Sequence, residues 1–270
     1  MPRTALQLAG CMLLVAPVLA WPQSYREAWM ADRQLAQDLR DRGVRCEMDS
    51  AVVFFEQDAL TEEQRQAFAA LVNKGIEDIR TYLKLPARTD KIQYFVSGRV
   101  EISHSRSRVI YLPLERVQNR SAPYLHETLH ILEPCRHCET WLSEGFASFV
   151  QSYVSEHIGG YDGAIFARDG NKGVDKAAAR WLTRDGGKTV VQYVGAVGEP
   201  PNMGEDRSGV AAPFYVMSQS FVKFLVERNG IEAMTAALRA DDFGQALESA
   251  TQSTLAEMKK AWMAQIVGHE

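Results

Sequence analysis

Apolar and polar positions in the first part of the chain predict a small mixed sheet. Residues 44–56, 91–97 and 108–112 are rich in β-branched and aromatic side chains and predict three strands. Between the first two, residues 60–85 have helical spacing, which Pro86 ends. Strands that alternate in this way with a long helix predict a twisted sheet backed by helices.

Helical spacing dominates the centre of the chain. Leu125, Leu129 and Leu132 recur at intervals of three and four residues and predict the apolar face of a first helix. Ser121 is the expected N-cap of this helix, and Pro123 falls in its first turn. The helix therefore has one face for packing and another face for polar side chains.

A second helix, at 140–156, and a helical C-terminal region are predicted next. The apolar stripe of the second helix consists of Trp141, Leu142, Gly145, Phe146, Phe149 and Tyr153. Near the C-terminus, Trp262 is expected to anchor an amphipathic helix in the core. The fold class that we expect is α+β, with a small twisted β-sheet followed by a mainly helical C-terminal half.

The composition is that of an ordinary globular protein. Its 270 residues are 46% hydrophobic, which is ample for a sizeable core. The formal net charge is −4, so neither nucleic acid nor an anionic membrane is an expected partner. Nothing in the sequence defines the oligomeric state.

Residues 1–20 have the pattern of a secretory signal peptide. Arg3 supplies a short positive region, an apolar stretch follows, and the residues up to Ala20 fit the small-x-small cleavage preference. Cys11 lies in a segment that resembles a lipoprotein box, but most of the apolar stretch follows this cysteine rather than preceding it. We therefore expect cleavage after Ala20 and a secreted or periplasmic protein without stable membrane insertion.

The predicted first helix contains the pattern His-Glu-x-x-His. His126 and His130 are four residues apart and lie on one helical face, separated by about 6 Å of rise. Two imidazoles in this arrangement can hold one Zn²⁺. Glu127 directly follows the first imidazole and can act as a general base without binding the metal.

A catalytic zinc usually takes three protein ligands, so one more is needed. Glu133 shares the helical face of the histidines, but one straight helix can hardly close a tetrahedral site. His137 does not fit the metzincin spacing, which places the third histidine at position 136. Glu144 opens the second helix, and a carboxylate from that helix can close the site from the opposite side. Glu144 is therefore the predicted third ligand of one Zn²⁺ per chain.

The combination of a His-Glu-x-x-His helix with a Trp141-Leu-Ser-Glu-Gly145 helix resembles the gluzincin metallopeptidases, and among them the compact bacterial peptidase MA-like group. The helical segments 215–230 and 243–262 are also similar to C-terminal helices of that group. The resemblance implies a zincin-like fold and a peptide or protein substrate. The Gly-Ala-Met-Glu-Asn segment of the large gluzincin aminopeptidases is absent from the sequence, so aminopeptidase specificity is not implied.

The same resemblance suggests roles for residues outside the motif. Several gluzincins use a tyrosine from a later helix to donate a hydrogen bond to the oxyanion, and Tyr215 lies at a similar place; a buried structural tyrosine is the equal alternative. Gluzincins also hold an extended peptide along an edge strand, for which residues 109–112 are the candidate by position. His104 could touch the substrate, although a solvated loop histidine explains it more simply.

Three cysteines are expected in the exported protein. Cys135 and Cys138 flank two residues in the connector between the two predicted helices, and Cys46 lies in the first predicted strand. In an oxidising compartment we expect a disulfide, either between Cys135 and Cys138 or between Cys46 and one of them. A zinc ribbon or a redox pair explains this spacing less well, because a ribbon needs two such pairs.

These observations predict an exported zinc metallopeptidase. The expected organisation is a signal peptide at 1–20, an N-terminal helix at 21–43 and a catalytic domain at 44–270. Within that domain, residues 44–135 contain the sheet and residues 136–270 are helical. The competing class is a non-catalytic zinc-site protein that holds a peptide or a cell-envelope component in its cleft. An intact Glu127 argues against that class.

Overall fold

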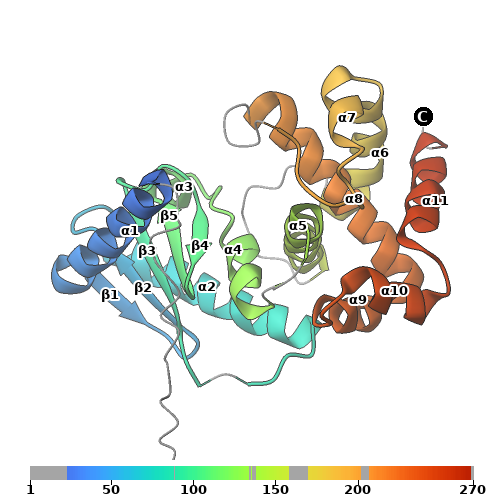
Figure 1. Cartoon of the computed structure of the whole chain (residues 1–270). Helices are drawn as coiled ribbons and strands as arrows, with labels where there is room; N and C mark the ends of the chain where they lie inside the picture. The colour runs from blue at the N-terminus through green and yellow to red at the C-terminus, as the bar shows by residue number, and fades with distance from the viewer. Residues whose placement is uncertain are drawn as a thin grey trace, which may run out of the picture.

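The computed structural model describes residues 23–87, 89–133, 135, 138–157, 170–201 and 207–268. Within them, a twisted five-stranded sheet lies beside a mainly helical half, and two central helices lie between these parts (Figure 1). The structure therefore confirms the expected α+β class. The strands are β1 (Val44–Glu47), β2 (Ala51–Phe55), β3 (Ile92–Ser97), β4 (His104–Arg106) and β5 (Val109–Pro113).

The sheet has the order β1-β2-β3-β5-β4. Its central strands β2, β3 and β5 are parallel, and the two edge strands β1 and β4 are antiparallel to their neighbours. The expectation of one strand at 44–56 is wrong, because this segment forms the hairpin of β1 and β2. The turn residues Asp49 and Ser50 reverse the chain, and the amide of Met48 donates to the carbonyl of Ala51 over 2.9 Å.

The position of the edge strand also differs from the expectation. Residues 109–112 belong to β5, which is paired on both sides, and the edge strand on this side is β4. A two-residue turn joins β4 to β5, and its residues Ser107 and Arg108 have φ values of 49° and 68°. A strand of three polar or charged residues has no apolar alternation, so its pattern predicted a loop.

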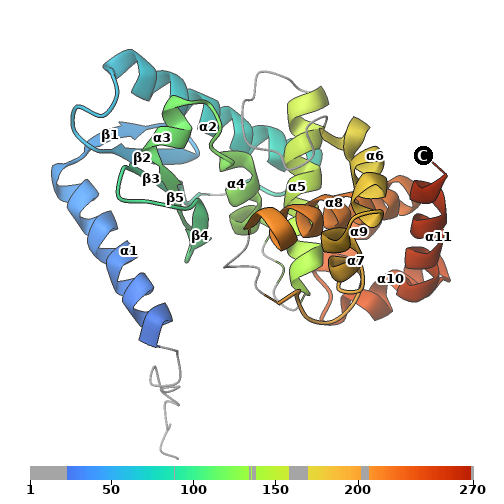
Figure 2. The ribbon, with the colours of Figure 1, turned by 90° about the horizontal axis from the view of Figure 1, so that it is seen from above.

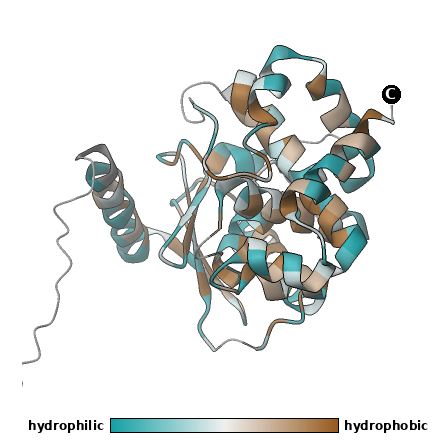
Figure 3. Ribbon diagram, turned by 45° about the vertical axis from the view of Figure 1, so that its right-hand side comes forward, coloured by the Kyte–Doolittle hydropathy of each residue, from teal (hydrophilic) through white to brown (hydrophobic). Residues whose placement is uncertain are grey.

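Helices cover both faces of the sheet. On the outer face, α1 (Gln23–Arg42) packs its apolar stripe against side chains of β2, β3 and β5, and the buried residues include Leu35, Leu39, Phe54 and Phe95. On the inner face lie α2 (Glu62–Tyr82) and α4 (Tyr124–Leu132). Figure 2 shows α1 and α2 on opposite sides of the strands, and Figure 3 shows α1 as a mainly hydrophilic helix beside the sheet.

The central helix α4 is fixed from two sides. Toward the sheet, the hydroxyl groups of Tyr94 and Thr128 are 2.6 Å apart and both are buried. On its other side α4 packs on α5 (Thr140–His157), and α3 (Leu114–Gln118) precedes it in the chain. The expected N-cap is wrong: Pro123 takes that position without a side-chain hydrogen bond, while the hydroxyl of Ser121 donates to the carbonyl of Arg116.

The C-terminal half is helical, as expected. Its elements are α6 (Gly170–Leu182), α7 (Asp185–Val190), a π-helical turn (Arg207–Ala211), α8 (Ala212–Asn229), α9 (Ile231–Leu238), α10 (Phe243–Thr251) and α11 (Leu255–Val267). The prediction for Trp262 is confirmed, since this side chain is fully buried and its Nε1 donates to Ser220 over 2.9 Å.

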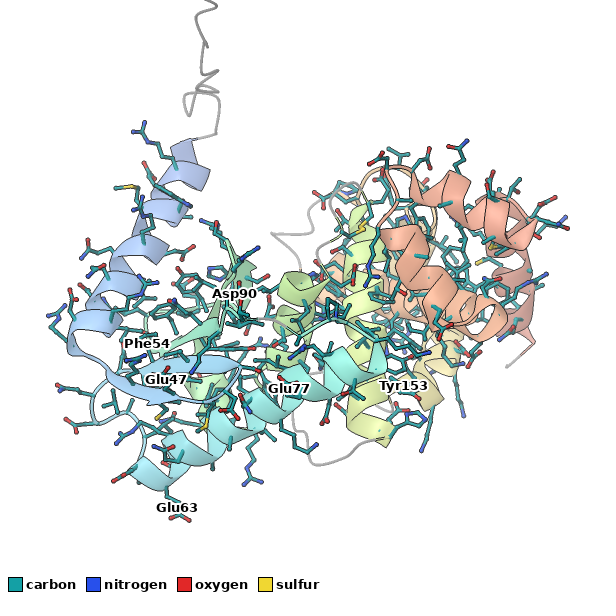
Figure 4. All side chains as sticks on the ribbon, turned by 90° about the horizontal axis from the view of Figure 1, so that it is seen from below. Glu47, Phe54, Glu63, Glu77, Asp90 and Tyr153 are labelled. Carbon is teal, nitrogen blue, oxygen red and sulfur yellow. A yellow bond between two sulfur atoms is a disulfide. The ribbon has the colours of Figure 1, made fainter. Side chains whose placement is uncertain are left out.

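A contact between two aromatic rings connects α5 to α2. Tyr153 of α5 stacks on Tyr82 of α2 at 4.0 Å between ring centroids, and Figure 4 shows Tyr153 beside one end of α2.

The segment Gly209–Asn229 is the one helix in the described part of the chain with the length and hydropathy to cross a membrane. Most of this segment is buried against α5 and α6, as in the core helix of a globular domain.

The connector between α4 and α5 contains a disulfide between Cys135 and Cys138. This is one of the pairings that the sequence left open. Cys46 is a free thiol buried in the core under the sheet, and burial raises the pKa of this thiol. The disulfide cross-links two positions within the segment that joins α4 to α5.

We expect thiol labelling to separate these cysteines. In unreduced, denatured protein that lacks the signal segment, Cys46 alone should react with maleimide, because Cys135 and Cys138 are paired. The same sample after reduction should label at all three positions, and mass spectrometry of the labelled peptides measures both outcomes. Labelling at all three positions without reduction, together with a second bound zinc, would instead support a metal site at Cys135 and Cys138.

Candidate metal centre

The helices α4 and α5 lie side by side (Figure 1), and the two histidines of the motif meet at their contact, where both rings approach Glu144 of α5. His126 is 8% exposed, and its Nε2 lies 3.2 Å from the Nε2 of His130. The two rings are nearly perpendicular, with an interplanar angle of 81° and centroids 4.8 Å apart. Each ring therefore directs the same nitrogen toward one shared point.

Glu144 brings a carboxylate to this point from α5. One of its oxygens lies 3.0 Å from Nε2 of His126, and the other lies 3.6 Å from Nε2 of His130. Glu144 falls in the second turn of α5, and the neighbouring Gly145 lies so close to α8 that a Cβ there would come within 2.6 Å of the Ser218 carbonyl oxygen. The lack of a side chain at Gly145 lets the helix that carries Glu144 pack closely on α8.

The three side chains fit a tetrahedral zinc ion. Ligand atoms that each lie 2.0–2.1 Å from such an ion are roughly 3.3 Å apart. The two Nε2 atoms are 3.2 Å apart, and one Glu144 oxygen lies 3.0 Å from the Nε2 of His126, so both separations are close to this value. The 3.6 Å to the Nε2 of His130 is measured from the other Glu144 oxygen, and one ligand atom from each residue lies within 4.8 Å of the others. Two imidazole nitrogens and one carboxylate are also the donor set of many catalytic zinc sites. His126, His130 and Glu144 thus form a group that can hold a metal ion and leave its fourth position open.

Side chains of α5 hold the ring nitrogens that face away from this point. The Nδ1 of His130 lies 3.3 Å from the hydroxyl of Ser143, and the Nδ1 of His126 lies 3.5 Å from the hydroxyl of Ser148. A hydroxyl that accepts from Nδ1–H leaves Nε2 without a proton and ready to bind a metal. Gln151 of the same helix accepts a hydrogen bond from the backbone amide of His126 over 3.1 Å. Helical spacing places Ser148 and Gln151 on the same face of this helix as Glu144, but the sequence contains no indication of the hydrogen bonds that the three residues make.

Burial and the neighbouring charges shift the pKa values of Glu144 and His130 in opposite directions. Burial alone favours the neutral acid of Glu144, but hydrogen bonds from His126 and His130 hold the pKa of this carboxyl well below its usual range. Burial likewise opposes the charged form of His130, yet the hydrogen bond and the charge of Glu144 raise its pKa. The ionised carboxylate of Glu144 therefore favours the protonated form of His130, and binding of a metal ion would compete with that proton.

Glu127 lies next to this group without joining it. Its side chain comes from the same helix, and the residue is 7% exposed. Its negative charge acts on His130, which places it close to the metal ligands. A carboxylate that lies beside a metal site without being a ligand is what a general base requires.

Tyr215 also lies beside the group. It is in the first turn of α8, and its ring centroid is 6.2 Å from that of His126. This distance places its ring near the metal ligands, as the expected oxyanion donor requires. The structure brings Tyr215 to the site, and its catalytic role stays a prediction.

The other candidates for the third ligand differ in position. Both oxygens of Glu133 are bound by Arg239, with Nε at 2.9 Å and Nη2 at 2.5 Å, so this carboxylate is engaged away from the histidines. His137 lies outside the described residues.

His104, the candidate substrate contact, lies on β4 and not in a loop. Its ring stacks on Tyr111 at 4.8 Å, and its Nε2 is 3.2 Å from Asp32 of α1.

A groove lies between His130 and the edge of the sheet. It lies beside His130, between the C-terminal turn of α4 and the β4–β5 hairpin, and has a volume of about 340 Å³. Residues 105–108 of the hairpin and residues 130–132 of α4 form its walls. The free edge of β4 therefore borders the same groove as a candidate zinc ligand.

A scan of the sequence against protein-family models found no match, and a search of curated protein sequences found none either. The structure is similar to an M1 zinc metallopeptidase from Deinococcus radiodurans, with 13% identity and a TM-score of 0.45 over 85% of this chain and 52% of that chain. A mutant of the M1 enzyme from that organism, bound to a Tyr-Ser-Ala substrate, gives 13% identity and a TM-score of 0.43 over 81% and 50%.

A further M1 zinc metallopeptidase mutant, bound to L-arginine, gives 14% identity and a TM-score of 0.41. It aligns over 83% of this chain and 49% of its own length. The chain thus spans about half the length of the structures that it matches. The function proposed below rests on the geometry of the site alone.

Proposed function

We propose that this chain is a zinc-dependent metallopeptidase of the gluzincin type, similar to the compact peptidase MA-like enzymes. One observation carries the proposal: two imidazole nitrogens and a carboxylate converge within the reach of one metal ion, and the carboxylate of Glu127 comes from the same helix beside them without being one of the three. The first three groups suit a catalytic zinc with an open position, and the fourth suits a general base.

The residues of the chain then have distinct roles in peptide hydrolysis. Bound zinc would supply Lewis-acid polarisation of the attacking water and of the scissile carbonyl group. Glu127 accepts the proton of the attacking water and delivers it to the leaving nitrogen. Tyr215 donates a hydrogen bond to the developing oxyanion, and Ser143 and Ser148 keep the two histidines in the tautomer that binds metal.

The peptide lies along the outer edge of β4 in this proposal. An extended segment that adds to a sheet edge gains main-chain hydrogen bonds, and its side chains alternate between the two faces of the sheet. The edge of β4 borders the groove that contains His130, so a peptide bound there passes the metal group. This replaces the original candidate strand, 109–112, with residues 104–106.

We further propose that the protein is exported, with a signal peptide at 1–20 and the catalytic domain at 44–270. The pattern of residues 1–20 and the disulfide between Cys135 and Cys138 support export, because disulfides persist in oxidising compartments. The alternative function, a non-catalytic zinc-site protein, explains the ligand group equally well. It does not explain the carboxylate of Glu127 beside the ligand group, because a binding module has no need of a base next to the metal.

A peptide library tests the proposed function. Zinc-loaded protein should cleave members of a broad fluorogenic library, and treatment with a chelator followed by dialysis should abolish the cleavage, because His126, His130 and Glu144 cannot activate water alone. Addition of about one equivalent of zinc per chain should restore the activity. A protein that binds library peptides only when zinc is present, yet cleaves none, would be the non-catalytic alternative.

A further inference from the structure

The edge strand β4 has a hollow on each of its two sides. The groove on the side of α4 contains His130 and has been described above. A second groove, of about 850 Å³, lies on the opposite face between β4 and α1, and all three residues of β4 contribute to its lining. We call this hollow the α1 groove. Its volume falls within the usual range of small-ligand pockets.

The α1 groove has apolar side chains on two sides, and polar or charged side chains complete its lining: Asp32, Gln34, Arg99, Glu101, His104, Ser105 and Arg106. On α1, Ala28, Ala31 and Leu35 follow one another at helical spacing and form one wall. Val100 and Ile102, from the segment before β4, form the other, and Ile102 is 44% exposed. A large aliphatic side chain exposed inside a groove retains apolar surface that a bound side chain can cover.

A cluster of polar contacts fixes α1 beside β4. Asp32 of α1 pairs with Arg106 at 3.1 Å and with His104 at 3.2 Å, and its backbone carbonyl accepts a hydrogen bond from Tyr111 at 3.2 Å. His104 and Arg106 thus project toward α1. Because side chains alternate along a strand, Ser105 between them projects toward α4. One face of β4 is therefore turned toward each groove, and Ser105 and Arg106 contribute to the lining of both.

The hairpin register defines how a peptide would meet this edge. Arg106 pairs with Val109 across the two-residue turn, and Ser105 pairs with Ile110. In such a hairpin the pair next to the turn exchanges hydrogen bonds, so the backbone N–H and C=O of Ser105 point outward to the free edge. A peptide residue opposite Ser105 would project its side chain toward the metal, and the residues on either side of it would project toward α1.

We propose that the α1 groove is a substrate subsite that takes a bulky apolar side chain. This inference rests on the proposed function, because it assigns the groove to a peptide bound along β4. The alternation of side chains along a strand links the α1 groove to the metal group. A peptide that presents one residue to the metal group must present the residues before and after it to the α1 groove. The apolar walls favour an extended substrate with leucine- or phenylalanine-sized residues at those neighbouring positions.

The test compares matched fluorogenic peptides in which one position at a time carries either Phe or Ala. With the zinc-loaded full chain, the Phe peptide should be cleaved with a kcat/KM about tenfold higher at every second position, and not at the positions between. Ala31→Trp fills the groove and should lower this Phe-to-Ala ratio by about tenfold. Ile102→Asp, which places a charge in the opposite wall, should lower the same ratio.

The matched control is Ala70→Trp, which replaces an exposed alanine on α2 outside the α1 groove. This variant should keep the wild-type ratio. A wild-type enzyme that cleaves peptides without the alternating preference, or an Ala31→Trp variant that keeps the full ratio, would overturn the subsite and leave the proposed function intact. If wild type cleaves nothing, fluorescence anisotropy decides: about tenfold tighter binding of the Phe peptide, lost in Ala31→Trp, supports the groove, and equal affinities overturn it.

Discussion

Replacing Glu127 by glutamine should lower peptide hydrolysis by at least about two orders of magnitude and leave the bound zinc in place. General acid–base assistance typically contributes 10²–10⁴-fold, and an amide cannot accept the proton of water at neutral pH. The amide has nearly the same size, so the buried site should keep its packing. Peptide affinity should change little, since the lost interaction belongs to the transition state. Turnover, zinc content and peptide binding are measured side by side.

Glu133→Gln provides the matched control for this experiment. Glu133 follows the same helix α4 and undergoes the same change of charge, but its carboxylate is bound by Arg239 and not directed at the histidines. This variant should hydrolyse peptides at close to the wild-type rate. A Glu127→Gln enzyme that is as fast as wild type would contradict the assignment of Glu127 as the general base.

The metal group was predictable because helical spacing determines which side chains share one face of a helix. The four-residue interval between His126 and His130 sets their common face whatever surrounds α4. Glu144 required a further assumption, namely that a second helix packs antiparallel to the first. The apolar stripe of the 140–156 segment supported this assumption, and the structure brings Glu144 to the histidines.

The supporting residues were not predictable from local spacing. Ser143, Ser148 and Gln151 reach the histidines only because α5 crosses α4 at a particular angle, and such an angle results from packing of the whole core. A serine or glutamine on a helix has no distinctive pattern of its own. Their role is visible only when the two helices are seen together.

The substrate edge was missed for a different reason. An apolar run predicts a buried strand, and β5 is indeed the buried neighbour of the edge. The edge strand β4 has the sequence His104-Ser-Arg106, and its conformation comes from pairing with β5 through a tight turn. Short polar edge strands are common because they discourage unwanted pairing between molecules, and they carry little sequence signal.

Replacing Glu144 by alanine should remove most of the zinc and reduce the thermal stability that zinc confers. Three ligands from two helices make a preorganised site, and loss of the α5 carboxylate leaves two imidazoles from a single helix. A ligand that binds only the folded state at 100 times its dissociation constant contributes about 2.7 kcal/mol to the free energy of unfolding. Wild type should therefore gain several degrees in Tm on addition of zinc, whereas Glu144→Ala should gain little.

The comparison among variants decides which residues hold the metal. His126→Ala and His130→Ala should lose zinc as Glu144→Ala does, and all three should lose hydrolysis. Glu133→Ala removes a carboxylate that is bound by Arg239 and does not reach the histidines, so it should keep both zinc and activity. Zinc per chain, measured by elemental analysis after dialysis, reports each result directly. Full zinc in Glu144→Ala, together with loss in Glu133→Ala or His137→Ala, would show that the third ligand comes from the α4 end of the connector rather than from α5.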